Sequence, residues 1–269
     1  MRFLRLMWSF VRRDALTAVS YRTAFLLPFV KIFFAVPIFY FMTQLVGSDR
    51  VEVSQLYQGN FFAFLLLGLA FQDYVALSLS SFMTSIRDHQ LMGTMEIVVL
   101  SPTPAPMILL FSSIWSYLFT SLRFTLFIAL GLAFGLDLSN ANVLSFVLVA
   151  AIAIVSFTAI GILAASIGLI IKQGSSVVTL LTATTLVLGG VFYPITVLPG
   201  WLQSVAQALP FTHALVGVRK ALLMGATLGD LRTELLVLGA FGVVLFPLAL
   251  WAFELALRRV KATGTLGQF

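Results

Sequence analysis

Among the ionisable side chains that interrupt long apolar stretches of this sequence are Asp73, which follows Gln72, and Arg123. An ionisable side chain inside a lipid bilayer is costly and usually pairs with an opposite charge. The two stretches are consecutive, so we expect them to run antiparallel and to bring Asp73 and Arg123 together as an intramembrane ion pair. We interpret this pair as a structural tie, and a contact with a transported substrate is the alternative.

The side chains needed for catalysis or metal binding are not grouped in the sequence. There is no cysteine, and the two histidines, His89 and His213, are expected on opposite sides of the membrane, so no metal site is predicted. The ATP-binding pattern G-x-x-x-x-G-K-[ST] does not occur, nor do G-x-S-x-G and H-E-x-x-H. We therefore predict a chain that is no enzyme, holds no cofactor and takes its energy from a partner.

An irregular segment, 93–104, separates two apolar stretches and reads GTMEIVVLSPTP. A short helix is expected over 95–100, with Thr94 as its N-cap and Glu96 in the first turn, where a carboxylate is favourable. The prolines that follow end this helix and restart the chain. The helix is too apolar for a solvated loop, so we expect it to dock into another protein, and the alternative is a turn in the headgroup region.

A second irregular segment, 189–213, lies where a span is expected to leave the membrane. Two prolines end the span, and Trp201 suits an interfacial depth. Apolar residues of 201–209 recur at helical spacing, which predicts a short helix that re-enters the outer leaflet before Pro210 breaks it. Irregular backbone at membrane depth is tolerated where protein or a water-filled cavity satisfies it, so we expect this segment to cap a pathway.

Three threonines, Thr179, Thr182 and Thr185, recur at helical spacing in a further apolar stretch. Hydroxyl side chains commonly hydrogen-bond neighbouring helices in membranes, which is the interpretation we favour. Lining of a transport pathway is the alternative.

The elements that must position these residues are membrane-spanning helices. Of the 269 residues, 60% are hydrophobic and 10% are charged, which is far from the composition of soluble domains. The mean hydropathy is +1.06, and several apolar runs exceed the roughly 18 residues that mark a spanning helix. We predict an all-α membrane protein, and its six expected spans are 24–46, 61–86, 107–136, 143–171, 177–195 and 235–257.

The first residues, 1–14, place arginines on one arc of a helix and apolar residues on the rest. The apolar part is too short to span, so we expect an amphipathic helix on the cytoplasmic leaflet, and an ordinary basic tail is the alternative. The chain is predicted to be one permease domain, 1–269, with this helix in 1–22, the six-span core in 24–257 and a cytoplasmic tail in 258–269.

Charge sets the expected orientation. Eight arginines and lysines lie in the two terminal arms, 1–22 and 258–269, which places both termini in the cytoplasm of a multi-pass protein of the cell (inner) membrane. The predicted outer loop 196–234 disagrees, because it holds Arg219, Lys220 and Arg232. We expect these three residues to have local partners or to lie near headgroups.

Two segments carry a family resemblance. Segment 93–104 resembles the first cytoplasmic loop of the type-two ABC transporter permeases, which reads G-T-x-E-x-[IL]-x-x-[ST]-P. Segment 192–225 is similar to the family's C-terminal signature, F-x-P-x-x-x-[LM]-P-x-W, a short helix, P-x-T and a later arginine. The residues that carry this second match are Phe192, Pro194, Pro199, Trp201, Pro210, Thr212 and Arg219. With six spans and both termini inside, the resemblance covers nearly the whole chain.

The resemblance implies a transmembrane subunit of a prokaryotic ABC exporter that acts as a dimer, with itself or a related permease. Segment 93–104 would hold the coupling helix, docked on a separate subunit that binds ATP and Mg, and segment 192–219 the outer gate. Exported cargo in this family includes drugs, lipids and lipid-linked glycans, and the apolar spans favour a hydrophobic or amphipathic one. The residues expected to contact the ATP-binding subunit are Gly93, Thr94, Glu96, Ile97, Leu100 and Pro102.

Two other classes of function stay open. A secondary transporter driven by protons or ions would use Asp73 as the carrier, but it gives no use to an apolar cytoplasmic helix. A membrane-embedded enzyme or assembly scaffold would need clustered catalytic side chains, which the sequence does not show.

Overall fold

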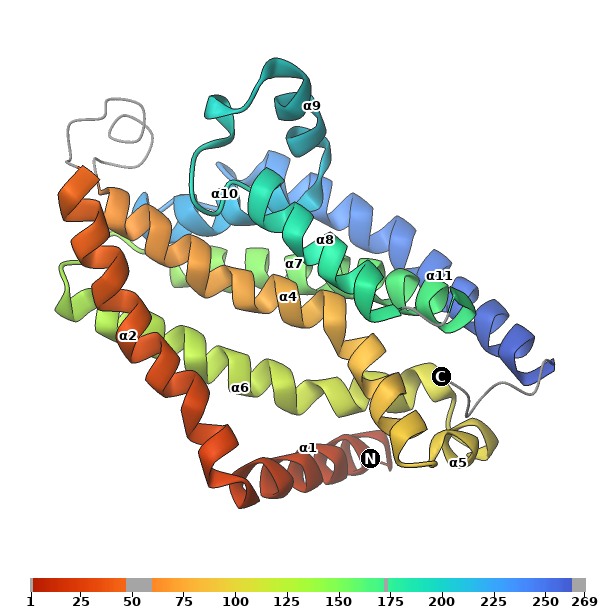
Figure 1. The fold of residues 1–269 in the computed structure, drawn as a ribbon. Coiled ribbons are helices and arrows are strands. Elements are labelled where there is room, and N and C mark those ends of the chain that lie inside the picture. Colours follow the sequence, from red (N-terminus) through yellow and green to blue (C-terminus); the bar gives the residue numbers. More distant parts are fainter. Residues whose placement is uncertain (1, 47–59, 172–173, 263–269) are drawn as a thin grey trace.

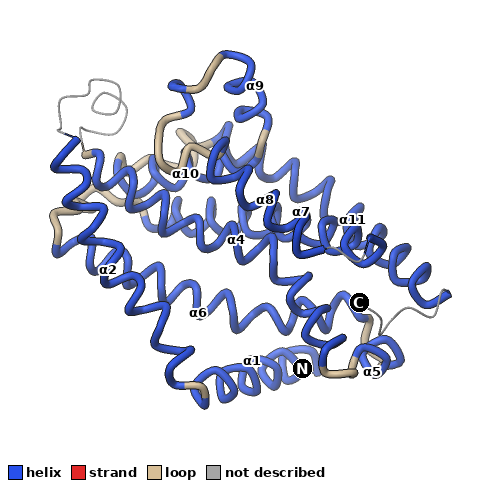
Figure 2. The backbone as a smooth tube through the Cα atoms, viewed as in Figure 1, coloured by secondary structure: helices blue, strands red, loops and turns tan. Residues whose placement is uncertain are grey.

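The computed structural model describes residues 2–46, 60–171 and 174–262, and this part of the chain consists of helices and loops without a strand (Figures 1 and 2). The elements in chain order are α1 (Arg2–Ser20), α2 (Arg22–Val46), α4 (Phe61–Leu91), α5 (Met95–Leu100), α6 (Ala105–Ala133), α7 (Val143–Ile171), α8 (Gly174–Leu188), the 3-10 turn η1 (Ile195–Val197), α9 (Gly200–Ala208), α10 (Pro210–Leu223) and α11 (Arg232–Ala262).

The prediction of an all-α membrane protein is confirmed. Within the described residues, five helices are long and apolar enough to cross a membrane, namely α2, α4, α6, α7 and α11. Their bounds lie within a few residues of five predicted spans, and α7 coincides with 143–171.

The remaining predicted span, 177–195, differs from the structure. Its helix, α8, has 15 residues and ends at Leu188, so it is about 22 Å long and shorter than the ~30 Å hydrocarbon core. The chain leaves the helix at Gly189 and Gly190, and Gly190 has a φ of 72°, which glycine adopts without a steric penalty. The glycine pair therefore ends the helix before Pro194, where the sequence analysis placed the end.

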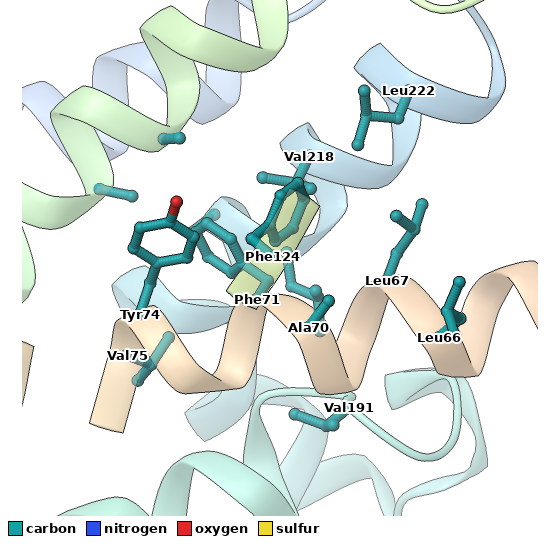
Figure 3. Packing of buried hydrophobic residues seen from close by; sticks show 14 of the residues in the cluster. Leu66, Leu67, Ala70, Phe71, Tyr74, Val75, Phe124, Val191, Val218 and Leu222 are labelled. Carbon is teal, nitrogen blue, oxygen red and sulfur yellow. The ribbon is translucent and has the colours of Figure 1, made fainter. Parts of the chain in front are cut away.

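Helix α4 lies at the centre of the bundle, against α6, α7, α8 and α10. Figure 3 shows Leu67 and Phe71 of α4 facing Val218 and Leu222 of α10 across a buried apolar layer. Close approach to α7 depends on Gly161, since a Cβ at this position would collide with the carbonyl oxygen of Ser78. Helix α10 lies against α4, α7 and α11, so the segment after the predicted fifth span is built into the core.

A second hydrophobic cluster joins α5 to α4, α6, α7 and α11, and we call this region of the bundle the α5 end (Figure 1). The opposite end, the far end, holds the loops between α6 and α7 and between α10 and α11. The α6–α7 loop touches the end of α10 and the loop that follows it: the Asn142 amide donates to the Ala221 carbonyl at 2.9 Å, and a Cβ at Gly225 would collide with Asn140.

The N-terminal segment is helical, as predicted. Helix α1 packs on α6 through Phe10, whose ring centroid lies 5.9 Å from that of Phe111. Trp8, Leu16 and Val19 are exposed. The placement of this helix on a membrane surface stays a prediction.

Candidate functional site

Helix α5 begins and ends where the sequence predicts and has two different faces. Met95 and Val98 are buried in the cluster at the α5 end. Glu96, in the first turn, is exposed, and Ile97 and Leu100 are 69% and 83% exposed. The helix is therefore anchored to the spans on one side and presents two large apolar side chains and a carboxylate on the other.

The start of α5 differs from the expected cap. Thr94 is at the N-cap position but makes no capping hydrogen bond. Its hydroxyl Oγ1 lies 2.9 Å from Nδ1 of His89 and 3.3 Å from the His89 carbonyl oxygen, to which it donates. Gly93 makes the turn with a φ of 66°, and exposed Pro102 lies in the loop to α6. A histidine at the end of α4 thus binds the hydroxyl that the sequence analysis assigned to the cap.

The segment after α8 folds back through local hydrogen bonds. The Tyr193 hydroxyl donates to the Val187 carbonyl at 2.7 Å, and Gln203 Nε2 donates to the carbonyls of Thr196 and Leu198. Pro194 is buried at the start of η1, and Pro199 is the N-cap of α9. The remaining two signature residues here are exposed, Phe192 by 38% and Trp201 by 71%.

The turn between α9 and α10 is closed by side chains of the P-x-T motif. Pro210 is the first residue of α10, where a missing N–H has no cost. The Thr212 hydroxyl donates to the Ala206 carbonyl at 2.6 Å, and His213 Nε2 lies 2.8 Å from the Gln207 carbonyl oxygen. Two of the last carbonyls of α9 are thereby satisfied, and these bonds hold the turn between α9 and α10.

Arg219 is 2% exposed and binds backbone oxygens of two other segments. Its Nη1 donates to the Gly190 carbonyl at 2.8 Å, and its Nη2 donates to the carbonyls of Phe64 at 2.9 Å and Val191 at 3.0 Å. The guanidinium carbon lies 3.4 Å from the Phe64 ring centroid. A buried cation is stable where it is hydrogen-bonded, so Arg219 ties α10 to α4 and to the end of α8.

The neighbouring cation also has a local partner. Lys220 Nζ lies 2.7 Å from Oε1 of Glu234, whose side chain is 7% exposed. The expectation that basic residues of the predicted outer loop serve local purposes is met by Arg219 and Lys220. Arg232 is exposed at the start of α11.

The structure brings Asp73 and Arg123 together, with 3.2 Å between Asp73 Oδ2 and Arg123 Nη1. Arg123 Nη2 donates to Thr120 Oγ1 at 3.0 Å, and the guanidinium stands 5.6 Å from the Phe119 ring centroid. The side chains are 35% and 23% exposed, respectively. The pair therefore joins α4 to α6 and is partly accessible.

The three threonines of α8 lie in different environments: Thr179 is exposed, Thr182 half-buried and Thr185 buried. Thr185 accepts a hydrogen bond from Gln72 Nε2 at 2.9 Å and donates to the Thr182 carbonyl. Thr185 thus links α8 to α4, and the role of the threonines in a pathway stays a prediction.

A comparison with known families gives this geometry its context. The family model for the ABC-2 type transporter matches residues 5–223, from α1 to the last residue of α10. The chain belongs to the ABC-2 type transporter family. No curated protein matches the chain. The resemblance seen in segments 93–104 and 192–225 is confirmed, since both segments lie within or at the edge of the matched range.

As an ABC-2 type permease, the chain is the membrane component of an ABC transporter, and the family implies a separate ABC ATP-binding partner.

Sequence reasoning missed three contacts that shape its site. These are the hydrogen bond from Arg219 to the Phe64 carbonyl, the Lys220–Glu234 ion pair and the Gln72–Thr185 hydrogen bond. A buried arginine among apolar residues of α10 was the one visible signal, because it needs acceptors that its own helix does not supply.

Proposed function

We propose that this permease is the transmembrane subunit of an ATP-driven exporter and that α5 is its coupling helix. The observation that carries the proposal is the division of α5 into a buried and an exposed face. Met95 and Val98 connect it to a cluster shared by α4, α6, α7 and α11, while Ile97 and Leu100 are left for a partner.

Such an arrangement suits the transmission of movement. An ATP-binding subunit that grips Glu96, Ile97 and Leu100 would displace α5, and the displacement would reach the spans because closely packed side chains move together. Coupling requires that the partner contact α5 differently in its two states. ATP and Mg would be bound by that subunit.

A second permease copy, or a related chain, would cover the exposed face of α2. This helix buries little of its apolar surface within the chain. Its large exposed side chains include Leu26, Leu27, Val30, Phe33, Phe34, Ile38 and Phe41. Their number favours a dimer in the cell membrane that covers this face. The cargo expected for apolar spans is hydrophobic or amphipathic.

Charge reversal on α5 tests this proposal. The permease is co-expressed with a candidate ABC ATP-binding subunit and purified in nanodiscs. The variants are wild type, Glu96→Arg and the control Asp137→Arg, which reverses an exposed carboxylate at the far end. We expect Glu96→Arg to lose at least about tenfold in complex formation or ATP turnover, since a favourable charged contact becomes repulsive. Asp137→Arg should match wild type.

The contrary result would be an uncoupled permease. In that case no ATPase associates with wild type, and transport in vesicles follows a proton gradient and requires Asp73. The chain would then act as a secondary transporter, and α5 would not couple ATP hydrolysis to transport.

A further inference from the structure

A polar cleft of about 300 Å³ lies at the α5 end, between the loop that follows α5 and the last turns of α11. Its wall on α11 is formed by Glu254, Leu257, Arg258 and Lys261, which recur at a spacing of three and four residues and so share one face of the helix. The other wall is formed by Val99 of α5 and the loop 101–106. The cleft therefore begins at the helix whose exposed side chains we assign to the ATP-binding subunit.

Contacts within the chain hold both walls of this cleft. Leu257 is buried in the hydrophobic cluster of the α5 end. In the loop, the Ser101 hydroxyl donates to the Thr103 carbonyl at 2.8 Å, and Pro104 and Pro106 restrict the backbone. The cleft is thus formed before any partner arrives, which lowers the cost of ordering it on binding.

The cleft has an excess of positive charge that the fold does not need. Lys261 is exposed and, among the described residues, forms no ion pair within 4.0 Å. Arg258 Nη2 lies 3.9 Å from Glu254 Oε2, and the two side chains are 79% and 57% exposed, so this pair contributes little to stability. Two cations and one carboxylate therefore line an open cleft, which suits an anionic group from outside the chain.

The position of the cleft favours a protein partner over a lipid headgroup. Lys261 lies about 6 Å along the helix past Leu257, where the predicted last span ends. On the opposite wall, the chain next to Val99 exposes Leu100 by 83% and Pro102 beside it. A subunit docked on these two residues would stand in front of the cleft and exclude lipid from it.

We propose that this cleft binds an acidic side chain, an aspartate or a glutamate, of the ABC ATP-binding subunit. Lys261 and Arg258 bind the carboxylate, and the charge of Glu254 opposes it. The contact extends the coupling interface from α5 to α11, so movement of the subunit also reaches the last span directly. The inference rests on the proposed function and deepens it by naming a second contact with the same partner.

Carbodiimide cross-linking tests the contact itself. The full-length permease is combined with a candidate ABC ATP-binding subunit in nanodiscs of phosphatidylcholine, a lipid without carboxylates. The reagent joins a lysine amine to a carboxylate in direct contact, and mass spectrometry identifies the joined peptides. We expect Lys261 to be joined to an aspartate or glutamate of the subunit. Lys261→Arg should keep the affinity and lose the cross-link, since it keeps the charge without the amine.

Binding affinity tests the charge of the cleft. We expect Lys261→Glu to weaken binding of the subunit about tenfold, because an attraction becomes a repulsion. Glu254→Gln should tighten it by about threefold, since an exposed opposing charge is removed. The matched control is Arg259→Glu, which makes the same charge change at an exposed position outside the cleft lining and should match wild type. Gel filtration checks that each variant is folded.

Four results would overturn the proposal. The first is a Lys261 cross-link found only within the permease, to Glu254 or to a second copy. The second is unchanged affinity in Lys261→Glu, and the third is an equal loss in Arg259→Glu, which would indicate a general effect of surface charge. The fourth is an effect of Lys261→Glu seen only in nanodiscs that contain anionic lipid, which would assign the cleft to a headgroup.

The two contacts on the subunit can be separated. A subunit whose binding depends on Glu96 and not on Lys261 refutes the cleft and keeps the coupling helix. Binding that depends on Lys261 and not on Glu96 keeps the cleft and refutes docking through α5. Failure of any ABC ATP-binding subunit to associate with wild type refutes both.

Discussion

At the scale of single residues, the lack of a side chain at Gly68 lets the Arg219 guanidinium reach its backbone acceptors. A Cβ at Gly68 would lie 2.6 Å from Arg219 Nη2 and 2.6 Å from the Val191 carbonyl oxygen. The backbone oxygen cannot move aside without breaking the bonds that hold the end of α8. We expect Gly68→Ala to destabilise the permease by about 1–3 kcal/mol through overpacking, measured as a lower midpoint of thermal unfolding in detergent.

The matched control is Gly239→Ala in α11, where a Cβ would meet no atom within 4 Å. This substitution should leave the midpoint unchanged or raise it slightly, because alanine favours helices. Equal midpoints for the two variants would mean that the Arg219 contacts are not tightly packed.

At the scale of elements, the turn into α5 depends on Gly93. Its φ of 66° lies in the left-handed region, and a Cβ there would meet no atom within 4 Å, so a substitution acts through backbone strain alone. Alanine costs about 1–2 kcal/mol in this conformation, whereas asparagine adopts it more readily. We expect Gly93→Ala to speed hydrogen exchange in α5 about fivefold and Gly93→Asn to have less effect.

Gly200→Ala in α9 serves as the control for this exchange measurement, since its Cβ also meets nothing and its φ is not in the left-handed region. Unchanged exchange of α5 amides in Gly93→Ala would show that the turn does not hold the helix in place.

The elements also show which features a sequence can reveal. Local signals located α5 and α9 well, because prolines and glycines act on their immediate neighbours. The end of α8 was missed, since Gly189 and Gly190 were read as part of a span and Pro194 as its stop. The acceptors of Arg219 are 28 and more residues away in the chain, so only tertiary packing could identify them.

At the scale of the whole molecule, the expected orientation of the chain in the membrane follows from the placement of its lysines and arginines. Arg219 and Lys220 were the main conflict with cytoplasmic termini, but the structure gives the first three backbone acceptors and the second a carboxylate. The positive-inside rule counts lysines and arginines in short connections near the ends of spans, and the two terminal arms hold eight of them against three in 196–234. The α5 end, with Arg258 exposed, is therefore the expected cytoplasmic side.

The absence of cysteine makes this orientation directly measurable, since any introduced thiol is unique. Ser139→Cys at the far end and Arg258→Cys at the α5 end replace exposed side chains. A membrane-impermeant maleimide should label Ser139→Cys in intact cells and Arg258→Cys only after permeabilisation. The reverse pattern would put α5 outside the cell, away from ATP. An ATP-binding subunit could then not act on the spans through this helix, even though its exposed face is apolar.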